Sequence, residues 1–312
     1  MSSVQTPVIF CVFNRPELTA QVFARIRAVR PQTLYVICDG PRLDHSEDAE
    51  RVAAVRSLIE NGVDWPCKLI KDFAETNLGC GPRLASGLSA GFERLGEAIV
   101  LEDDCLPHAS FFDYCGWLLK HYRGDKEVMH INGTNLAAAR LQGAPSYRFS
   151  HHVWVWGWAS WQRAWTSYDY TMKEWPDQRA AAAATFASTW EAQYWTSTYD
   201  RTHRDIAGAN TWDFQWAATC RAQRGLTLLP ARNLVTNIGF HPSATHTTSG
   251  LEHLDLEYHP AAVARHPNVR FVNAYLDELF TRRYADAPRG IRANFFSHLR
   301  CLKRKFRSPN SI

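Results

Sequence analysis

Three consecutive carboxylates follow a short apolar run near the end of the first third of the chain. The apolar run is residues 98–101, and the acidic residues are Glu102, Asp103 and Asp104. A buried strand that ends in carboxylates places hard oxygen ligands at the carboxyl edge of a sheet, where open α/β sheets bind their ligands. Because adjacent carboxylates repel one another, we expect a cation such as Mg²⁺ or Mn²⁺ to balance them. A solvated turn or an acidic helix N-terminus is the alternative.

A fourth acidic residue stands in an aromatic setting. Asp213 is flanked by Trp212, Phe214 and Trp216. Poor solvation among these rings is expected to raise the pKa of its carboxyl group, which would make it a better general base toward a hydroxyl group that acts as nucleophile. We therefore interpret Asp213 as the candidate catalytic residue. The alternative is a helix N-cap whose aromatic neighbours pack in the core.

The elements that position these residues alternate between strands and helices in the first half. Continuous apolar runs predict buried strands, and apolar residues spaced by three or four predict helices. Such alternation is typical of a mostly parallel central sheet flanked by helices, that is, a Rossmann-like α/β fold. The predicted strands cover residues 7–13, 34–38, 67–72 and 98–101, and the predicted helices cover residues 18–29, 49–59 and 84–95.

The second half is rich in tryptophan. Trp154, Trp156 and Trp158 alternate, so in a strand they would share one face, either as a platform for a sugar or as part of an aromatic core. Gly157 between them would allow close backbone approach to a ligand. The remaining patterns predict a helix over residues 179–195, a strand over 226–230 and a loop over 233–248.

Composition limits the class of protein. The formal net charge of +4 with ordinary apolar content indicates a globular protein and argues against nucleic acid as a partner. The eight cysteines form no CxxC pair, and no signal-peptide pattern or membrane-spanning run is present, so we expect a cytoplasmic location. Residues 286–312 form a basic amphipathic tail, which fits peripheral contact with the inner membrane face; a packed terminal helix or a disordered tail is the alternative.

Taken in order, these motifs resemble a GT-A glycosyltransferase, the nucleotide-sugar-binding fold with an acidic metal motif. The triplet is similar to the EDD motif of the N-acetylglucosaminyltransferase I type, and the Trp motifs resemble bacterial hemolytic-protein-like sugar transferases. The resemblance implies one domain over residues 1–285, with a nucleotide-sugar half up to about residue 120 and an acceptor half from about 121. The motifs that carry it are Asn14-Arg15-Pro16-Glu17, Asp39-Gly40, Asn77-Leu78-Gly79, Glu102-Asp103-Asp104, Trp-Gly-Trp-Ala-Ser-Trp, Trp-Asp-Phe-Gln-Trp and Asn237-Ile238-Gly239-Phe240.

The resemblance also implies roles for individual residues. Asp104 is the expected direct ligand of Mn²⁺ or Mg²⁺, and His246 a second ligand, with His241 as its rival. The other implied contacts to the donor nucleotide or sugar come from Arg15, Asp39, Arg83, Glu102, Asp103 and Gly157, and those to the acceptor or a stacked sugar from Trp156, Trp158 and Trp212.

Three of these residues also have structural alternatives. Asp39 is placed to accept from a pyrimidine N3–H, but it could instead hold the turn before Gly40. Arg15 could pair with Glu17 rather than bind the nucleotide. Arg83 could form a surface salt bridge rather than bind a phosphate or a sugar hydroxyl.

The resulting prediction is a metal-dependent, inverting transfer of a sugar from a nucleotide-diphosphate sugar, with UDP favoured, to a glycan or lipid-linked saccharide. Two alternatives stay open. A sugar-phosphate nucleotidyltransferase would be expected to carry a Gly-rich basic loop after the first strand, where this chain has Asn14-Arg15-Pro16-Glu17. A non-catalytic carbohydrate-binding protein would explain the tryptophans but would leave the acidic triplet unused.

Overall fold

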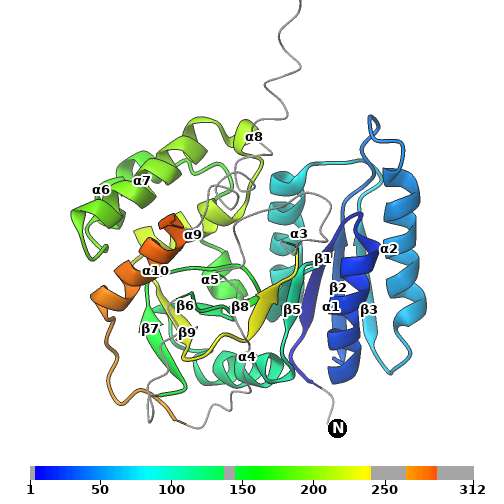
Figure 1. Cartoon of the computed structure of the whole chain (residues 1–312), viewed down its shortest axis with the longest axis horizontal. Helices are drawn as coiled ribbons and strands as arrows, with labels where there is room; N and C mark the ends of the chain where they lie inside the picture. Colours follow the sequence, from blue (N-terminus) through cyan, green and yellow to red (C-terminus); the bar gives the residue numbers. More distant parts are fainter. Residues whose placement is uncertain (1–3, 137–144, 240–264, 287–312) are drawn as a thin grey trace, which may run out of the picture.

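The computed structural model describes residues 4–136, 145–239 and 265–286. Its centre is an eight-stranded sheet in the order β3-β2-β1-β4-β8-β6-β9-β7, in which β7 and β8 run against the other strands. Helices flank this sheet (Figure 1). The strands are β1 Val8–Val12, β2 Thr33–Cys38, β3 Lys68–Phe73, β4 Glu97–Glu102, β6 Val128–Asn132, β7 Tyr147–Ser150, β8 Trp158–Trp161 and β9 Leu226–Pro230. The predicted mixed α/β class with a mostly parallel central sheet is confirmed.

The helices divide between the two faces of the sheet. Successive side chains of a strand point to opposite faces, so β1 sends Val8, Phe10 and Val12 into one core and Ile9 and Cys11 into the other. Helices α1, α2 and α4 contribute to the first core, whereas α3 and α5 contribute to the second. The helices are α1 Pro16–Val29, α2 Asp48–Gly62, α3 Cys80–Leu95, α4 Ala109–His121, α5 Gln162–Trp165, α6 Trp175–Ala183, α7 Thr189–Arg204, α8 Ile206–Ala209, α9 Asp213–Ala222 and α10 Ala274–Asp286.

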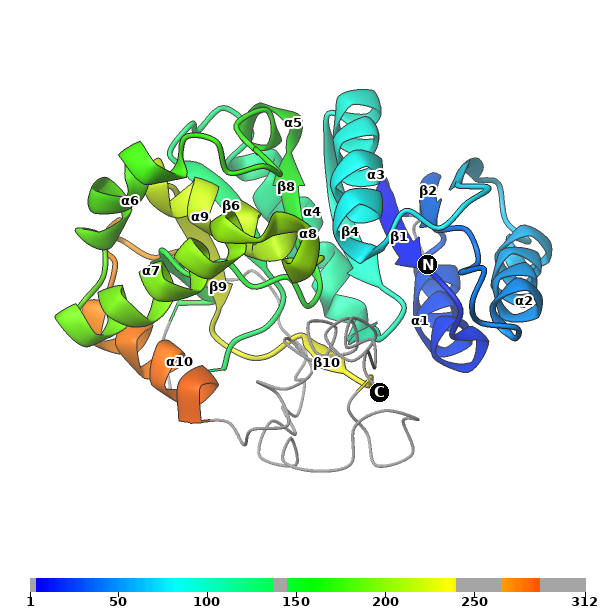
Figure 2. The ribbon, with the colours of Figure 1, turned by 90° about the horizontal axis from the view of Figure 1, so that it is seen from above.

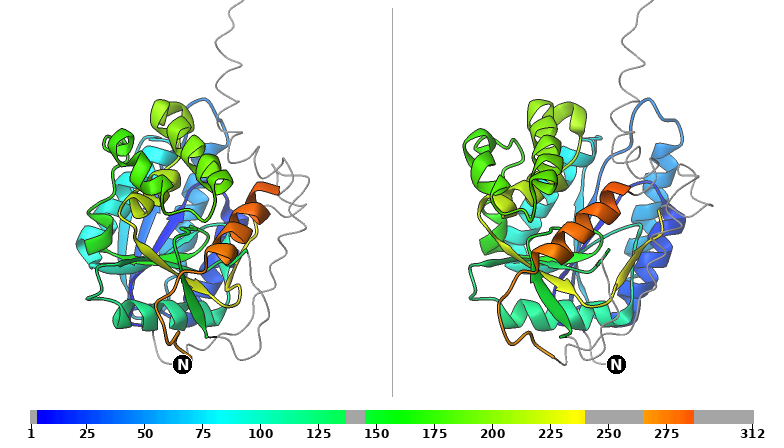
Figure 3. Two further views of the ribbon diagram at one scale, coloured as in Figure 1. Left: turned by 90° about the vertical axis from the view of Figure 1, so that its left-hand side faces the viewer. Right: turned by 60° about the vertical axis from the view of Figure 1, so that its left-hand side comes forward.

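The two halves of the sequence share this sheet. Strands β1 to β4 come from the first half, and β6 to β9 extend the same sheet beyond β4. Helices α1 and α2 lie at one end of the molecule and α6, α7 and α10 at the other, as seen from above in Figure 2; Figure 3 turns the end with α6, α7 and α10 toward the viewer. Among the described residues, no helix combines the length and apolarity that crossing a membrane requires.

A two-stranded antiparallel ribbon completes the fold. It pairs β5 Cys105–Pro107, directly after the acidic triplet, with β10 Val235–Asn237. Residues 235–237 are therefore strand rather than part of the loop predicted over 233–248. A strand of three or four residues that includes a polar residue is too short to show the alternation of apolar and polar positions by which strands are recognised.

The helix predicted over residues 179–195 is two helices, α6 and α7. Helix α7 begins at its own N-cap: the Ser188 hydroxyl accepts from the Glu191 N–H, and the Glu191 carboxylate accepts at 2.9 Å from the N–H of Ala187, the residue before the cap. The Ser-x-x-Glu spacing was present in the sequence as a helix-start signal within the Ala-rich run.

Candidate functional site

The acidic triplet lies at the point where the strand order reverses. From β1, the chain moves outward to β2 and β3 and then returns to place β4 on the other side of β1. Ligands of open α/β sheets bind at the carboxyl ends of strands at such a switch point. Glu102 is the last residue of β4, and Asp39 follows the end of β2 at the same edge.

Arg15 joins the first strand to the triplet. Its Nη1 lies 3.0 Å from Asp104 Oδ2 and its Nε lies 3.3 Å from Asp103 Oδ2, while its Nη2 contacts Asp103 Oδ1. Although burial acts in the opposite direction, the Asp103 and Asp104 carboxylates raise the pKa of Arg15. The predicted alternative, a pair with Glu17, is not what the structure shows. One guanidinium therefore contacts both aspartates, and its single positive charge offsets half of their combined negative charge.

Glu102 differs from its two neighbours because no guanidinium of the described part of the chain contacts its carboxylate. Burial and the negative charges of Asp104 and Asp103 raise its pKa well above the ordinary value, and Arg15 counteracts this only in part. Burial also raises the pKa of Asp103, against the effect of Arg15. The triplet thus carries more negative charge than its one arginine balances, which favours a further cation or a proton at Glu102.

Asp213 lies within electrostatic reach of the triplet. It is the first residue of α9, and its Oδ1 accepts a hydrogen bond from the Thr211 hydroxyl. Burial raises its pKa, in the direction expected from its aromatic neighbours, although the Thr211 contact opposes the shift. Its charge helps to raise the pKa values of Glu102 and of Cys80 at the start of α3. The fold thus brings together acidic residues that are more than 100 positions apart in the sequence.

Asp39 is saturated with hydrogen bonds. Its carboxylate accepts from the backbone N–H groups of Gly40 and Leu78 at 2.9 Å and of Gly79 at 3.0 Å, and from Asn77 Nδ2 at 3.0 Å. These contacts tie the loop after β2 to the start of α3. The structure therefore shows the turn-holding alternative, with every position of the carboxylate engaged by protein donors.

Arg83 is buried and does not face the triplet. Its Nη2 donates to the Asp72 carboxylate at 2.6 Å and to the Asp72 carbonyl oxygen at 2.5 Å. The guanidinium thereby fastens α3 to β3. Arg83 therefore forms a salt bridge, which was the predicted alternative. Unlike the surface pair that was expected, this one involves a buried arginine, which is only 5% exposed.

The tryptophans do not form a row. Only residues 158–161 of the tract are strand, so Trp154 and Trp156 pack in one core and Trp158 in the other. Trp158 is fully buried and Trp212 stacks on it with ring centroids 5.7 Å apart. The shared-face prediction was wrong, and Trp158 and Trp212 occupy the aromatic core rather than an exposed sugar platform. Trp156 is 8% exposed and borders a recess beside Asp213.

Gly157 is required by protein packing. Its φ is +63°, and a Cβ atom there would lie 2.6 Å from Val235 Cγ2. Its carbonyl oxygen accepts from the Gly133 N–H at 2.7 Å. The close backbone approach predicted at this glycine therefore occurs, but toward β10 and residue 133 rather than toward an open donor site.

The segment after β10 covers Asp104. The Ile238 N–H donates to the Asp104 carbonyl oxygen at 2.8 Å, and Asn237 Nδ2 lies 3.4 Å from Asp104 Oδ1. A Cβ on Gly239 would lie 2.6 Å from Asp104 Oδ2, so a larger residue there would force the Asp104 carboxylate to move. Asn237 and Gly239 were absent from the predicted site, although their motif belonged to the resemblance. His241 and His246 lie outside the described residues.

The donor set fits a hard divalent cation. Asp103 and Asp104 already converge on one positively charged group, and their oxygens are the ligands that Mg²⁺ and Mn²⁺ accept. No group of three or more His, Cys, Asp or Glu side chains is arranged for a metal within residues 4–136, 145–239 and 265–286. Two carboxylates are nevertheless enough for a cation that completes its shell with substrate phosphates and water.

Comparison with known proteins gives a limited match. No protein-family model and no curated protein matches the sequence. Among solved structures, the chain is similar to a UDP-glucose pyrophosphorylase in complex with UDP-glucose, with a TM-score of 0.26 and 12% sequence identity. The similar region covers 48% of this chain and 64% of that chain, so it spans less than two thirds of that enzyme.

Proposed function

We propose that this chain is a metal-dependent glycosyltransferase that uses a nucleotide-diphosphate sugar, with UDP favoured as the nucleotide. The observation that carries the proposal is the convergence of Arg15, Asp103 and Asp104 at the switch point of the sheet. The charge of Asp213 also acts on Glu102 of the triplet and helps to raise its pKa. The motif resemblance to GT-A enzymes supports the same reaction class.

In this proposal, Asp104 and Asp103 hold Mn²⁺ or Mg²⁺, and His246 adds a ligand. The cation, when bound, neutralises the charge that grows on the pyrophosphate leaving group. The Arg15 guanidinium, which now contacts Asp103 and Asp104, donates two hydrogen bonds to a phosphate in this proposal once it leaves the aspartates.

Asp213 takes the proton of the acceptor hydroxyl as that oxygen attacks the anomeric carbon, and the configuration at that carbon inverts. The acceptor is a glycan or a lipid-linked saccharide. Residues 1–285 act as one catalytic domain, and the basic tail over 286–312 contacts the membrane surface; residues 287–312 of the tail lie outside the described residues.

Calorimetric titration tests the donor site. UDP, GDP, CDP and TDP are each titrated with and without Mn²⁺, and one nucleotide is expected to bind only with the metal. Asp104→Ala should abolish this binding, whereas Asp113→Ala, which removes an exposed carboxylate on α4, should leave it unchanged. Absence of nucleotide binding under every condition would contradict the proposal and favour a carbohydrate-binding protein.

The nucleotidyltransferase alternative is tested by turnover. That enzyme class would join a sugar 1-phosphate to a nucleoside triphosphate and release pyrophosphate. Helix α1 begins at Pro16, four residues after the end of β1, and the residues between are not glycine-rich. We therefore expect no pyrophosphate release from such a mixture.

A further inference from the structure

The turn that leads into α9 rests on the start of α3. Asn210 Oδ1 accepts a hydrogen bond from the Gly81 N–H at 3.0 Å. Gly81 is the second residue of α3, and this helix follows the parallel strand β3, so it begins at the carboxyl edge of the sheet. Three residues after Asn210, the chain reaches Asp213 at the start of α9. One side chain thus joins the two halves of the sequence at the edge where the acidic triplet lies.

The contact between the two segments is tight. A Cβ on Gly81 would lie 2.6 Å from the Tyr170 hydroxyl oxygen, 2.9 Å from the Thr211 carbonyl oxygen and 3.0 Å from the Asn210 carbonyl carbon. A Cβ on Gly79 would lie 3.0 Å from Asn210 Oδ1. Because backbone meets backbone here, the separation between the start of α3 and residues 210–211 has little freedom to vary.

The backbone of Asn210 passes this position on to Asp213. The φ of Asn210 is +42°, in the left-handed region that asparagine adopts more readily than most residues. Directly after it, the Thr211 hydroxyl donates to Asp213 Oδ1, and the Thr211 carbonyl oxygen accepts from Gln215 Nε2 at 2.7 Å. Asp213 itself is partly exposed. The carboxylate is therefore accessible, and its place follows from where Asn210 is held.

The start of α3 is in turn bonded to the nucleotide half of the sheet edge. The Gly79 N–H donates to the Asp39 carboxylate at 3.0 Å, and Asp39 follows β2. Strand β2 neighbours β1, which neighbours β4 and its acidic triplet. A continuous path of hydrogen bonds and backbone contacts therefore runs from Asp39 through Gly79, Gly81 and Asn210 to Asp213.

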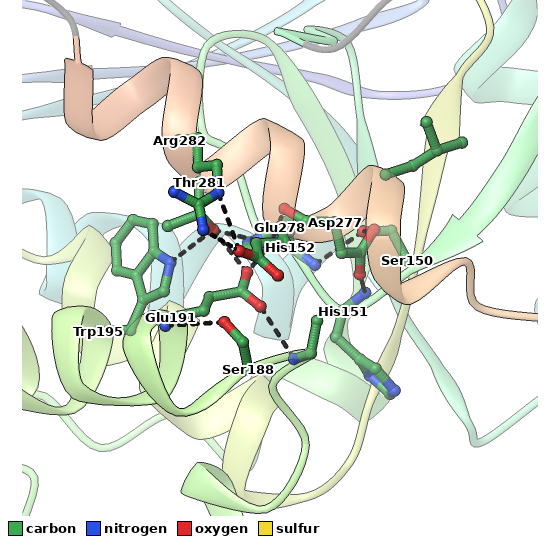
Figure 4. A network of polar contacts seen from close by, with 12 residues as sticks. Ser150, His151, His152, Ser188, Glu191, Trp195, Asp277, Glu278, Thr281 and Arg282 are labelled. Atoms are coloured by element: carbon green, nitrogen blue, oxygen red, sulfur yellow. Dashed lines mark hydrogen bonds and ion pairs between the residues drawn. The ribbon is translucent and has the colours of Figure 1, made fainter.

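The other end of α9 is fixed separately. Arg221, in its last turn, has Nη2 3.4 Å from His152 Nδ1. His152 Nε2 lies 2.9 Å from Glu191 Oε1 and 3.0 Å from the Asp277 carbonyl oxygen, within the buried network of Figure 4. This network fixes the end of α9 that is remote from Asp213. The position of the Asp213 end depends on the contact with α3.

We propose that Asn210 is a positioning residue for the transfer reaction: its hydrogen bond to the Gly81 N–H sets the distance between Asp213 and a donor bound at the sheet edge. The inference rests on the transferase function proposed above. A general base must lie within hydrogen-bond reach of the hydroxyl that it deprotonates, and a displacement of about 1 Å can cost about 10²-fold in rate. Loss of the contact should therefore slow the chemical step and leave nucleotide binding unchanged.

The test by turnover uses water as the acceptor. UDP release is measured with Mn²⁺ and saturating UDP-glucose, UDP-galactose or their 2-acetamido counterparts. The oxygen of water attacks the anomeric carbon, its proton passes to Asp213, and UDP leaves with the electrons of the broken glycosidic bond.

Two variants of Asn210 separate its hydrogen bond from its backbone conformation. Asn210→Gly deletes the acceptor oxygen but keeps the left-handed φ accessible, and should lower kcat by about tenfold or more with UDP affinity unchanged within about twofold. Asn210→Asp keeps an acceptor oxygen and should retain kcat within about threefold. A normal kcat in Asn210→Gly would overturn the inference. Equal loss in both variants, or a parallel loss of UDP affinity, would do the same.

A second readout needs no turnover. The carboxyl carbon resonance of Asp213, identified by its loss in Asp213→Asn, is followed by NMR in the full chain. Gly81→Ala places a methyl group against Tyr170 and Thr211 and should shift this resonance from the other half of the sequence. Gly124→Ala, where a Cβ would meet no atom within 4 Å, should leave it unchanged. An Asp213 resonance that does not respond to Gly81→Ala would overturn the inference.

Failure of the inference is distinguishable from failure of the proposed function. Metal-dependent UDP binding and UDP release by the wild type, with full kcat in Asn210→Gly, reject Asn210 as a positioning residue and leave the transferase proposal in place. A response of Asp213 to Gly81→Ala in a protein that neither binds nor releases UDP retains the contact between the two halves and rejects the transferase.

Discussion

The Arg15 guanidinium lies against the carboxylates of both Asp103 and Asp104, with Nη1 3.0 Å from Asp104 Oδ2. It occupies the position in which a divalent cation would contact the same two side chains. A metal that binds here must share these oxygens with Arg15 or displace it. The side chain of Arg15 is 41% exposed, so it has room to turn away.

The first prediction concerns this competition. In the absence of nucleotide, Arg15→Ala should bind Mn²⁺ about fivefold more tightly than the wild type, because a partly exposed ion pair worth about 1 kcal/mol no longer opposes the metal. Electron paramagnetic resonance of free Mn²⁺ measures the affinity. Arg42→Ala, which breaks a pair with Asp48 instead, serves as the control. Equal or weaker Mn²⁺ binding by Arg15→Ala would show that the two cations do not compete.

The second prediction separates catalysis from donor binding. Asp213→Asn should reduce turnover by about 10²-fold or more, because the amide cannot accept the acceptor proton, while UDP binding with Mn²⁺ stays intact. Asp205→Asn is a matched control, since Asp205 caps α8 through the Gly208 N–H and asparagine caps a helix equally well. Full activity of Asp213→Asn in an assay of sugar transfer would remove this residue from the mechanism.

The third prediction concerns the core position of Trp158. Trp158→Ala should lower the free energy of unfolding by about 3–5 kcal/mol, because a fully buried indole leaves a large cavity. Urea denaturation measures the change. Trp190→Ala removes an indole that is 37% exposed and should cost much less. A small loss of stability for Trp158→Ala, together with weaker sugar binding, would instead favour the stacking role.

The fourth prediction is a pH dependence that arises from His130. Its Nε2 donates to the Trp154 carbonyl oxygen at 3.0 Å and its Nδ1 accepts from Trp216 Nε1 at 3.1 Å, which fixes a neutral tautomer. Burial lowers the pKa of this imidazole to about 4. Between pH 6.5 and 4 the unfolded chain therefore binds more protons than the folded one.

Stability should consequently fall as the pH drops through this window, by about 3 kcal/mol in total from this one group. Urea denaturation at pH 7, 5.5 and 4.5 measures the loss. In NMR, the His130 ring should stay neutral down to about pH 4 in the folded protein. Titration of this ring near pH 6.5 without unfolding would contradict the assignment.

Much of the first half was predictable because strands buried on both faces carry uninterrupted apolar runs. The predicted strands over residues 7–13, 34–38 and 98–101 each agree with β1, β2 and β4 to within one residue at either end. Strand β6 gave no such signal, because His130 and Asn132 interrupt it. Both are buried and satisfied by the backbone around Trp154, a contact that depends on tertiary structure.

The acidic residues of the site were predictable from the sequence, whereas the residues that form ion pairs or hydrogen bonds with them were less so. The triplet ends a strand, and Asp213 begins a helix, both of which are local patterns. The pairing of Arg15 with Asp103 joins residues 88 positions apart, and Asp39 is bonded by residues nearly 40 positions away. No periodicity encodes such pairs, since they follow from which strands become neighbours.

The strand pair β5–β10 also bears on the order of events during synthesis. Asn237 reaches Asp104 across 133 residues of sequence. At ribosomal rates of about 5–20 residues per second, that length of chain takes roughly 7 to 27 seconds to make. Throughout this interval the nascent triplet has no cover from Asn237 or Gly239, and a cation in solution competes only with Arg15 for its carboxylates. The order of translation therefore allows a cation to bind the carboxylates before Asn237 and Gly239 cover them.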